Sequence, residues 1–147
     1  MPLYYSIVSI LGLALALLWP AVESAAEVER VVVLANANDS GSVEIAQYYA
    51  QQRGIPAANI IALKMPQTET VTVREFVAEV YNPLLNALIQ QGWMRAVKAS
   101  APDLAGRERV AVATHRISYL VTTRGVALRI ANDAALLEPH ANKLPSQ

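Results

Sequence analysis

Two polar segments, each following an apolar run, hold the side chains best suited to bind a ligand. Three polar residues come directly after the run 31–36, and one arginine comes after the run 117–122. In open α/β sheets, ligands bind beyond the carboxyl ends of the strands, where such segments meet. A helix expected to begin near Ser42 would also present free backbone amides to an anion. The resulting hypothesis is a ligand site made of Asn38, Asp39, Ser40 and Arg124.

The same residue types also have a purely structural interpretation. Asn, Asp and Ser are the side chains that most often cap the start of a helix, whatever the function of the protein. The segment 36–42 contains neither the GxGxxG pattern nor the lysine of a phosphate-binding loop. Helix capping is therefore the stronger interpretation of this segment. The sequence predicts no bound cofactor, no metal site and no catalytic residue.

A peptidase is the sharpest enzymatic alternative. Caspase- and gingipain-like peptidases carry a catalytic His-Gly pair just after a strand and a cysteine after the next one. Here the comparable position reads Arg124-Gly125, and the chain contains no cysteine. Arginine cannot act as a general base because its pKa stays above about 12. His115 and His140 are the two histidines, and their separation is not a metal-ligand spacing.

The first residues of the chain predict export. No charged residue occurs from Ile7 to Val22, and small residues follow Pro20. A short apolar core before small residues is typical of a secretory signal peptide, which we assign to residues 1–24. An exported protein of periplasmic or extracellular location is expected. The alternative is an uncleaved anchor at residues 7–22, although a membrane span needs about 20 apolar residues.

The charge balance and the absence of cysteine argue against two classes of protein, nucleic-acid-binding proteins and disulfide-rich domains. The chain has 12 basic and 12 acidic residues, and removal of residues 1–24 takes away Glu23 alone among the charges. A nearly neutral protein offers no electrostatic case for nucleic-acid binding. The absence of cysteine excludes a disulfide scaffold, so the fold must depend on a hydrophobic core.

Alternating strand and helix patterns predict the fold class. Residues 30–36 have the consecutive apolar side chains of a strand buried on both faces, and residues 59–63 predict a second strand. A helix should follow the first strand and end at Gly54. A capping box at Thr72 and Glu75 should begin another helix, which Pro83 would kink or restart. With a strand at 117–122, the order is β-α-β-α-β in an α/β fold. We expect a three-layer arrangement around a mostly parallel sheet.

The remaining segments set the domain boundaries. Residues 93–115 predict a loop around Pro102 and Gly106, with a short strand at 110–112. The domain is expected at 25–131, followed by a poorly structured tail at 132–147. Three strands are fewer than the usual five or six. The sequence therefore predicts an incomplete half of a larger flavodoxin-like or caspase-like sheet domain.

Three segments resemble the N-terminal part of an uncharacterised bacterial family that accompanies the exosortase/PEP-CTERM protein-sorting system. They read VVLANAN at 32–38 followed by SV at 42–43 and AQYYA at 46–50, RGIPAANI at 53–60, and ISYLVTTRGVALRI at 117–130. The resemblance implies an exported protein of an exosortase-bearing bacterium and implies no reaction. Ala127 stands where the family would have proline, and the C-terminal half of the family is absent from the sequence.

Two functional hypotheses follow. The first is an accessory or binding domain linked to exosortase-type envelope protein sorting, whose partners would be envelope or exopolysaccharide-sorting components. The second is the N-terminal half of a hydrolase whose catalytic site is completed by residues missing from this chain. In both cases contact with a membrane is expected only through an uncleaved N-terminal segment.

Overall fold

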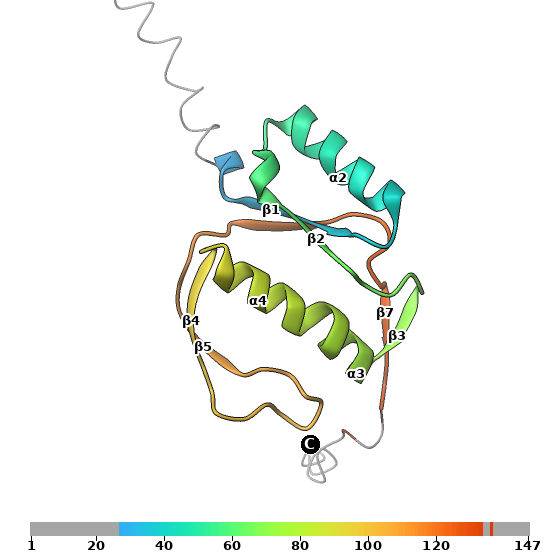
Figure 1. Ribbon diagram of the computed structural model, residues 1–147, viewed down its shortest axis with the longest axis vertical. Coiled ribbons are helices and arrows are strands. Elements are labelled where there is room, and N and C mark those ends of the chain that lie inside the picture. Colours follow the sequence, from blue (N-terminus) through green and yellow to red (C-terminus); the bar gives the residue numbers. More distant parts are fainter. Residues whose placement is uncertain (1–26, 134–135, 137–147) are drawn as a thin grey trace, which may run out of the picture.

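The computed structural model describes residues 27–133 and 136 (Figure 1). Its main sheet has three parallel strands in the order β2-β1-β6. The strands are β1 (Val31–Asn36), β2 (Ile60–Leu63) and β6 (Tyr119–Thr122). The mixed α/β class and the parallel pairing of the predicted strands are therefore confirmed. The predicted signal peptide at 1–24 and most of the tail at 132–147 lie outside the described residues.

The central strand β1 is buried on both faces, as its unbroken apolar run predicts. Val33 and Ala35 pack with residues of helix α2 (Ser40–Arg53), among them Ala46. Val32 and Leu34 face the other way and pack with a second helical segment and Trp93. This division follows from the two-residue period of a strand. Figure 1 shows α2 and α4 (Asn82–Gln90) on opposite sides of the β1–β2 pair.

Helix α2 has the caps that its sequence predicts. The Asp39 carboxylate accepts hydrogen bonds from the backbone N–H groups of Gly41 and Ser42 at the helix start. At the other end, Gly54 adopts a left-handed conformation with φ 66°. Only glycine takes this conformation without steric cost, so the helix ends there. A short 3-10 turn, η1 (Ala57–Asn59), then leads into β2.

The second helical segment is continuous but changes its winding before Pro83. It consists of α3 (Val73–Phe76), a π-helical turn η2 (Val77–Tyr81) and α4. The predicted capping box is confirmed, because Thr72 and Glu75 exchange side-chain and backbone hydrogen bonds. Proline has no N–H to donate to the turn before it. The ladder shifts instead, and Asn82 donates its backbone N–H to the carbonyl of Val77. Pro83 therefore lies at the start of a resumed α-helix.

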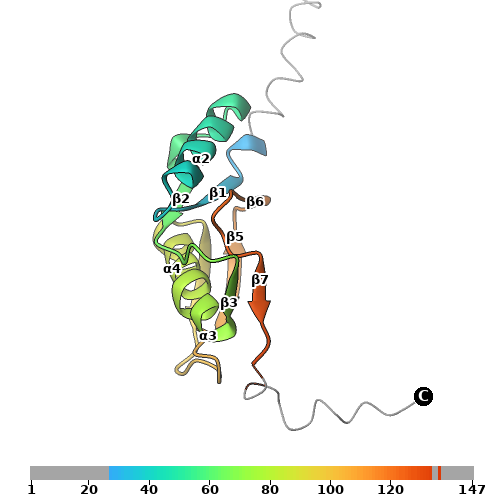
Figure 2. The same cartoon turned by 90° about the vertical axis from the view of Figure 1, so that its right-hand side faces the viewer.

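Two small sheets complete the described domain. Strands β3 (Thr70–Thr72) and β7 (Arg129–Ala131) pair in parallel, while β4 (Met94–Lys98) and β5 (Val110–His115) form an antiparallel pair. The β4–β5 hairpin occupies most of the region that predicts a loop with one short strand. In the view of Figure 2, β5, β6 and β7 lie on the side of the molecule away from α2, α3 and α4. None of the helices among the described residues is long and apolar enough to cross a membrane.

Candidate functional site

A polar junction lies where β1 and β6 end, and Asn36 is its centre. Asn36 is fully buried as the last residue of β1. Its side-chain amide donates hydrogen bonds to the carbonyl oxygens of Pro66 (3.1 Å) and Gly125 (2.7 Å). Its side-chain oxygen accepts from the backbone N–H groups of Asn38 (2.9 Å) and Met65 (3.1 Å). One buried side chain thus joins the segments that follow β1, β2 and β6.

Two hydroxyl groups continue this junction between α2 and β6. The Ser42 hydroxyl, which is fully buried, accepts a hydrogen bond from the Asn36 backbone N–H at 2.8 Å. It also lies 2.8 Å from the hydroxyl of Thr123. The Thr123 hydroxyl donates in turn to the carbonyl oxygen of Leu34 at 3.2 Å. The interior of the junction is therefore satisfied by groups of the protein itself.

The outer part of the junction is the pair formed by Asp39 and Arg124. The Arg124 Nε atom donates to Asp39 Oδ2 at 3.2 Å, while Asp39 Oδ1 accepts from the N–H of Gly41 at 3.0 Å. Gly125 fits tightly beneath this pair, because a Cβ built on it would lie 2.9 Å from Asp39 Oδ2. The Asp39 carboxylate thus takes the place beside the helix amides and the guanidinium that an external anion would need.

The four residues of the predicted ligand site are brought together only in part. Asp39 and Arg124 meet, as the convergence of two strand-end loops predicts. Asn38 lies on the other side and donates from its side-chain amide to the carbonyl of Met65 at 2.9 Å. Ser40 begins α2 as an exposed residue and is not part of the junction. Ligand binding by these residues remains a hypothesis.

The sequence analysis missed Asn36, Ser42 and Thr123, which hold the junction together. A signal for Asn36 was present, because it ends an otherwise apolar run, of which residues 32–35 are buried. A polar side chain at the end of a buried strand needs partners inside the protein. The identity of those partners, Pro66 and Gly125, depends on chain segments far away in sequence.

Unlike the junction, the side of β6 that faces away from β1 has main-chain groups with no strand partner among the described residues. We call this side the open edge. The backbone N–H groups of Tyr119 and Thr123 donate to carbonyls of the β1 segment. Alternate residues of a strand direct their N–H and C=O groups to opposite edges, so those of Leu120 and Thr122 point away from β1. Among the described residues no further strand pairs with β6. The Tyr119 and Leu120 side chains beside this edge are 57% and 46% exposed.

Three carboxyl groups outside the junction have lowered pKa values. The pKa of Asp103 is lowered chiefly because its carboxylate accepts a hydrogen bond from the Arg107 backbone N–H. The pKa of Glu108 is lowered mainly by a hydrogen bond from Lys98, whose Nζ atom lies 2.6 Å from Glu108 Oε2. The pKa of Glu75 is lowered by the backbone N–H of Thr72 in the capping box. Each carboxylate is held by neighbours that favour its charged form.

In the part of the chain that the structure describes, no histidine lies in a catalytic arrangement and no side-chain cluster could hold a metal ion. His115 is exposed, and its Nδ1 atom lies 3.1 Å from the carbonyl oxygen of Ile117. Over those residues no group of three or more His, Asp or Glu side chains is arranged to hold a metal ion. His140 lies outside them.

Comparison with known proteins does not place the chain in a family. A scan against protein-family models gave no match. Searches of curated proteins and of solved structures gave no significant match either. The resemblance of residues 30–130 to the exosortase-associated family is thus a prediction from the sequence.

Proposed function

We propose that this protein is an exported accessory domain that binds another polypeptide as an added strand on β6. The observation that carries the proposal is the open edge. Leu120 and Thr122 each direct a main-chain donor and acceptor away from β1, and Tyr119 and Leu120 leave apolar surface beside them. Added strands gain affinity from such main-chain bonds and specificity from the neighbouring side chains.

The composition of β6 supports this use of the edge. Proteins usually protect a free edge with lysine, proline, a bulge or a covering segment. The residues of β6 are Tyr, Leu, Val and Thr, with neither charge nor proline. Parallel sheets are normally covered on both faces, and the central strand β1 follows that rule. An uncharged, half-exposed parallel edge strand is therefore suited to pairing with a further strand.

A larger sheet is part of the proposal. Helices pack against both sides of β1, which supports a three-layer arrangement. A strand added to β6 would extend the sheet toward the strand number of flavodoxin-like or caspase-like domains. In this proposal the strand comes from a partner protein.

The setting that we propose is the bacterial envelope. The predicted signal peptide at 1–24 supports export, and the resemblance of residues 30–130 supports a role beside exosortase-type protein sorting. The partner is accordingly an envelope polypeptide with an extended apolar segment.

The junction favours one alternative function, an incomplete hydrolase. A strand paired in parallel with β6 would end near Thr123, beside the Asp39–Arg124 pair. A nucleophile or base carried by that strand would meet a fixed carboxylate and guanidinium there. This alternative requires the added strand to bring a catalytic side chain, whereas the accessory role requires only its backbone and apolar side chains.

Two exposed tyrosines allow a matched test of the binding proposal. A photo-crosslinking amino acid would replace Tyr119 beside the edge, or Tyr48 on α2, which is 66% exposed. Both variants would be expressed as the full chain in an exosortase-bearing bacterium. We expect position 119 to crosslink to one defined envelope polypeptide and position 48 not to do so.

The variant Thr122→Pro makes this test specific for strand pairing. Proline removes an N–H that points away from β1, and edge strands tolerate proline at such positions. The proposal predicts that Thr122→Pro abolishes the crosslink at position 119 while the protein stays folded by circular dichroism. A crosslink that persists in Thr122→Pro, an equal crosslink from position 48, or none from position 119 would contradict it.

A further inference from the structure

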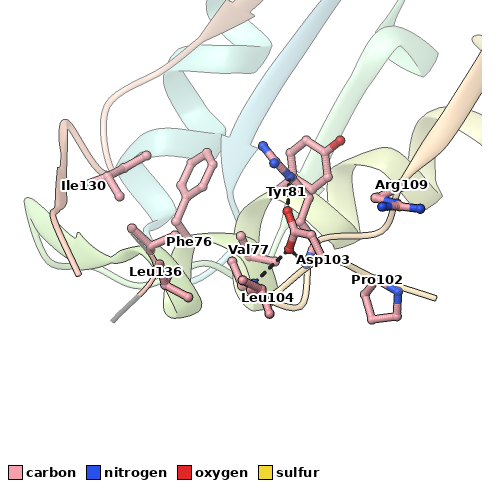
Figure 3. A pocket seen from close by; sticks show the side chains of 12 residues that line it. Phe76, Val77, Tyr81, Pro102, Asp103, Leu104, Arg109, Ile130 and Leu136 are labelled. Atoms are coloured by element: carbon pink, nitrogen blue, oxygen red, sulfur yellow. Dashed lines mark hydrogen bonds and ion pairs between the residues drawn. The ribbon is translucent and has the colours of Figure 1, made fainter. Parts of the chain in front are cut away.

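A second binding feature lies away from the sheet edge, between the π-helical turn, the 102–109 loop and β7. It is a cavity of about 910 Å³ (Figure 3). Ligand sites for small molecules commonly have about 300–1,000 Å³. In Figure 3, Ile130, Phe76 and Leu136 lie at one end of the cavity and Arg109 lies at the other, with Tyr81 between them.

The apolar part of the lining, which runs from Ile130 to Leu104, exposes side chains that would gain from being covered. Leu104 and Ile130 both line this cavity, and they are 68% and 46% exposed. Phe76 and Leu136 contribute further apolar surface from α3 and from beyond β7. Burial of such surface contributes about 25 cal/mol for each Å² removed from water. An aliphatic chain laid along these residues would therefore bind favourably.

The polar end has one uncompensated positive charge. Asp103 is engaged by Arg107, whose Nε atom lies 2.8 Å from Asp103 Oδ2, and by the backbone N–H of Ala105 at 2.9 Å. The Arg107 guanidinium also lies 6.0 Å from the centre of the Tyr81 ring. Arg109 forms no ion pair with any described residue. The cavity lining thus carries a net charge of about +1, since Asp103 and Arg107 cancel.

The π-helical turn beside the cavity is a second feature that favours a ligand site. Val77 and Tyr81, the first and last residues of the π-helical turn, both line the cavity. Short π-helical turns are rare and occur frequently at functional sites. The turn lies directly before Pro83, and Tyr81 is placed between the apolar end and Arg109.

We propose that this cavity binds a single-chain amphipathic anion, an aliphatic chain that ends in a carboxylate. The chain lies against Phe76, Leu104 and Ile130, and the carboxylate pairs with Arg109. A guanidinium fits a carboxylate with two parallel hydrogen bonds, which gives the headgroup a defined position. This site does not depend on the open edge of β6.

Decanoate is a suitable probe, used below its micelle concentration with the purified mature chain. Isothermal titration should show binding of decanoate in a 1:1 complex and much weaker binding of decanol and propionate. Decanol lacks the charge and propionate lacks the chain. Nuclear magnetic resonance should show shifts of the Leu104 and Ile130 methyl signals during the titration.

Two variants with the same change of charge test the role of Arg109. Arg109→Gln should weaken decanoate binding by tenfold or more, because a hydrogen bond to a charged group is lost. Arg95→Gln, at an exposed position of β4 that does not line the cavity, should leave decanoate binding unchanged. The proposal is overturned if decanoate does not bind, if decanol binds equally well, or if Arg109→Gln binds like the unchanged protein.

Discussion

The strand-end junction and the open edge meet at the end of β6 and use their polar groups in opposite ways. At the junction, Asn36 and Ser42 are fully buried and bonded to other groups of the protein. Along the edge, the outward main-chain groups of Leu120 and Thr122 have no strand to pair with among the described residues. Residue types typical of a ligand site can thus serve the fold, while a plain uncharged strand leaves main-chain groups without a strand partner among the described residues.

Substitutions in the two regions should also differ in their effect on the free energy of unfolding. Loss of one partner of a buried hydrogen bond leaves a polar group without compensation, which costs about 1–3 kcal/mol. Changes at exposed positions away from such features usually stay within about 0.5 kcal/mol. Substitutions at the junction should therefore lower the free energy of unfolding, and substitutions on the open edge should change binding instead.

The largest effect is expected from Asn36→Ala. It removes a side chain that joins three segments, and it leaves two partly buried carbonyl groups and the buried N–H of Met65 without this partner. We expect a loss of about 3–5 kcal/mol in the free energy of unfolding, since more than one such group is affected. Urea unfolding followed by circular dichroism would measure it. Asn38→Ala, an exposed position with a side-chain bond to Met65, is the control and should cost about 1 kcal/mol. Equal losses would show that burial of Asn36 is not what matters.

A smaller effect is expected from Gly125→Ala, with Gly106→Ala as its match. Both glycines have positive φ, 82° and 83°, so alanine is strained at each by about 1–2 kcal/mol. At Gly125 the new Cβ would also meet Asp39 Oδ2 at 2.9 Å, whereas nothing lies within 4 Å at Gly106. Thermal unfolding should therefore show a lower midpoint for Gly125→Ala than for Gly106→Ala. Identical midpoints would mean that the Asp39–Arg124 pair moves aside freely.

The outer pair of the junction should contribute less. Asp39→Ala removes the cap of α2 and should cost about 1 kcal/mol. Arg124→Gln removes an ion pair whose arginine side chain is 64% exposed, and should cost less than about 1 kcal/mol. Both values come from urea unfolding. A larger loss from Arg124→Gln than from Asp39→Ala would show that the guanidinium, not the helix cap, holds this end of the junction.

The smallest predicted effect is a loss of folding stability at acid pH. The pKa values of Glu75, Asp103 and Glu108 are lowered in the folded protein by hydrogen bonds to their charged forms. Their contribution to stability is present above the unfolded values of 4.5 and 3.8 and is lost as the pH falls through the lower folded values. Stability should hold at neutral pH and decline below about pH 4. Asp103→Asn should flatten that decline. An unchanged acid profile in this variant would contradict the assigned role of the Arg107 backbone.

Local patterns in the sequence predict the helices and the main sheet well. The consecutive apolar residues of β1 predict a strand buried on both faces, and Thr72 with Glu75 predicts a helix start. Each of these features depends on neighbours in sequence. The β4–β5 hairpin was not predicted as such, because β4 reads Met-Arg-Ala-Val-Lys and shows no clear alternation. It becomes a strand through its antiparallel pairing with β5, the next strand along the chain.

Only part of the candidate site can be predicted from the sequence. The topology of parallel strands places Asp39 near Arg124, and the sequence is sufficient to expect that. It does not show that Asn36 reaches Gly125 and Pro66, because those contacts depend on how three separate segments pack. The exposed state of β6 is also a property of the assembled sheet, since its sequence resembles that of the buried strands.

Amide hydrogen exchange along β6, measured by nuclear magnetic resonance on the purified chain, tests the open edge most directly. The N–H groups of Tyr119, Val121 and Thr123 face β1 and should exchange slowly. Those of Leu120 and Thr122 should exchange much faster, with solvent as their partner. Such alternation is expected if the outer side of β6 is unpaired in the isolated protein. Slow exchange at Leu120 and Thr122 in the isolated chain would show that the edge is already paired, and would contradict the proposed binding of a partner strand.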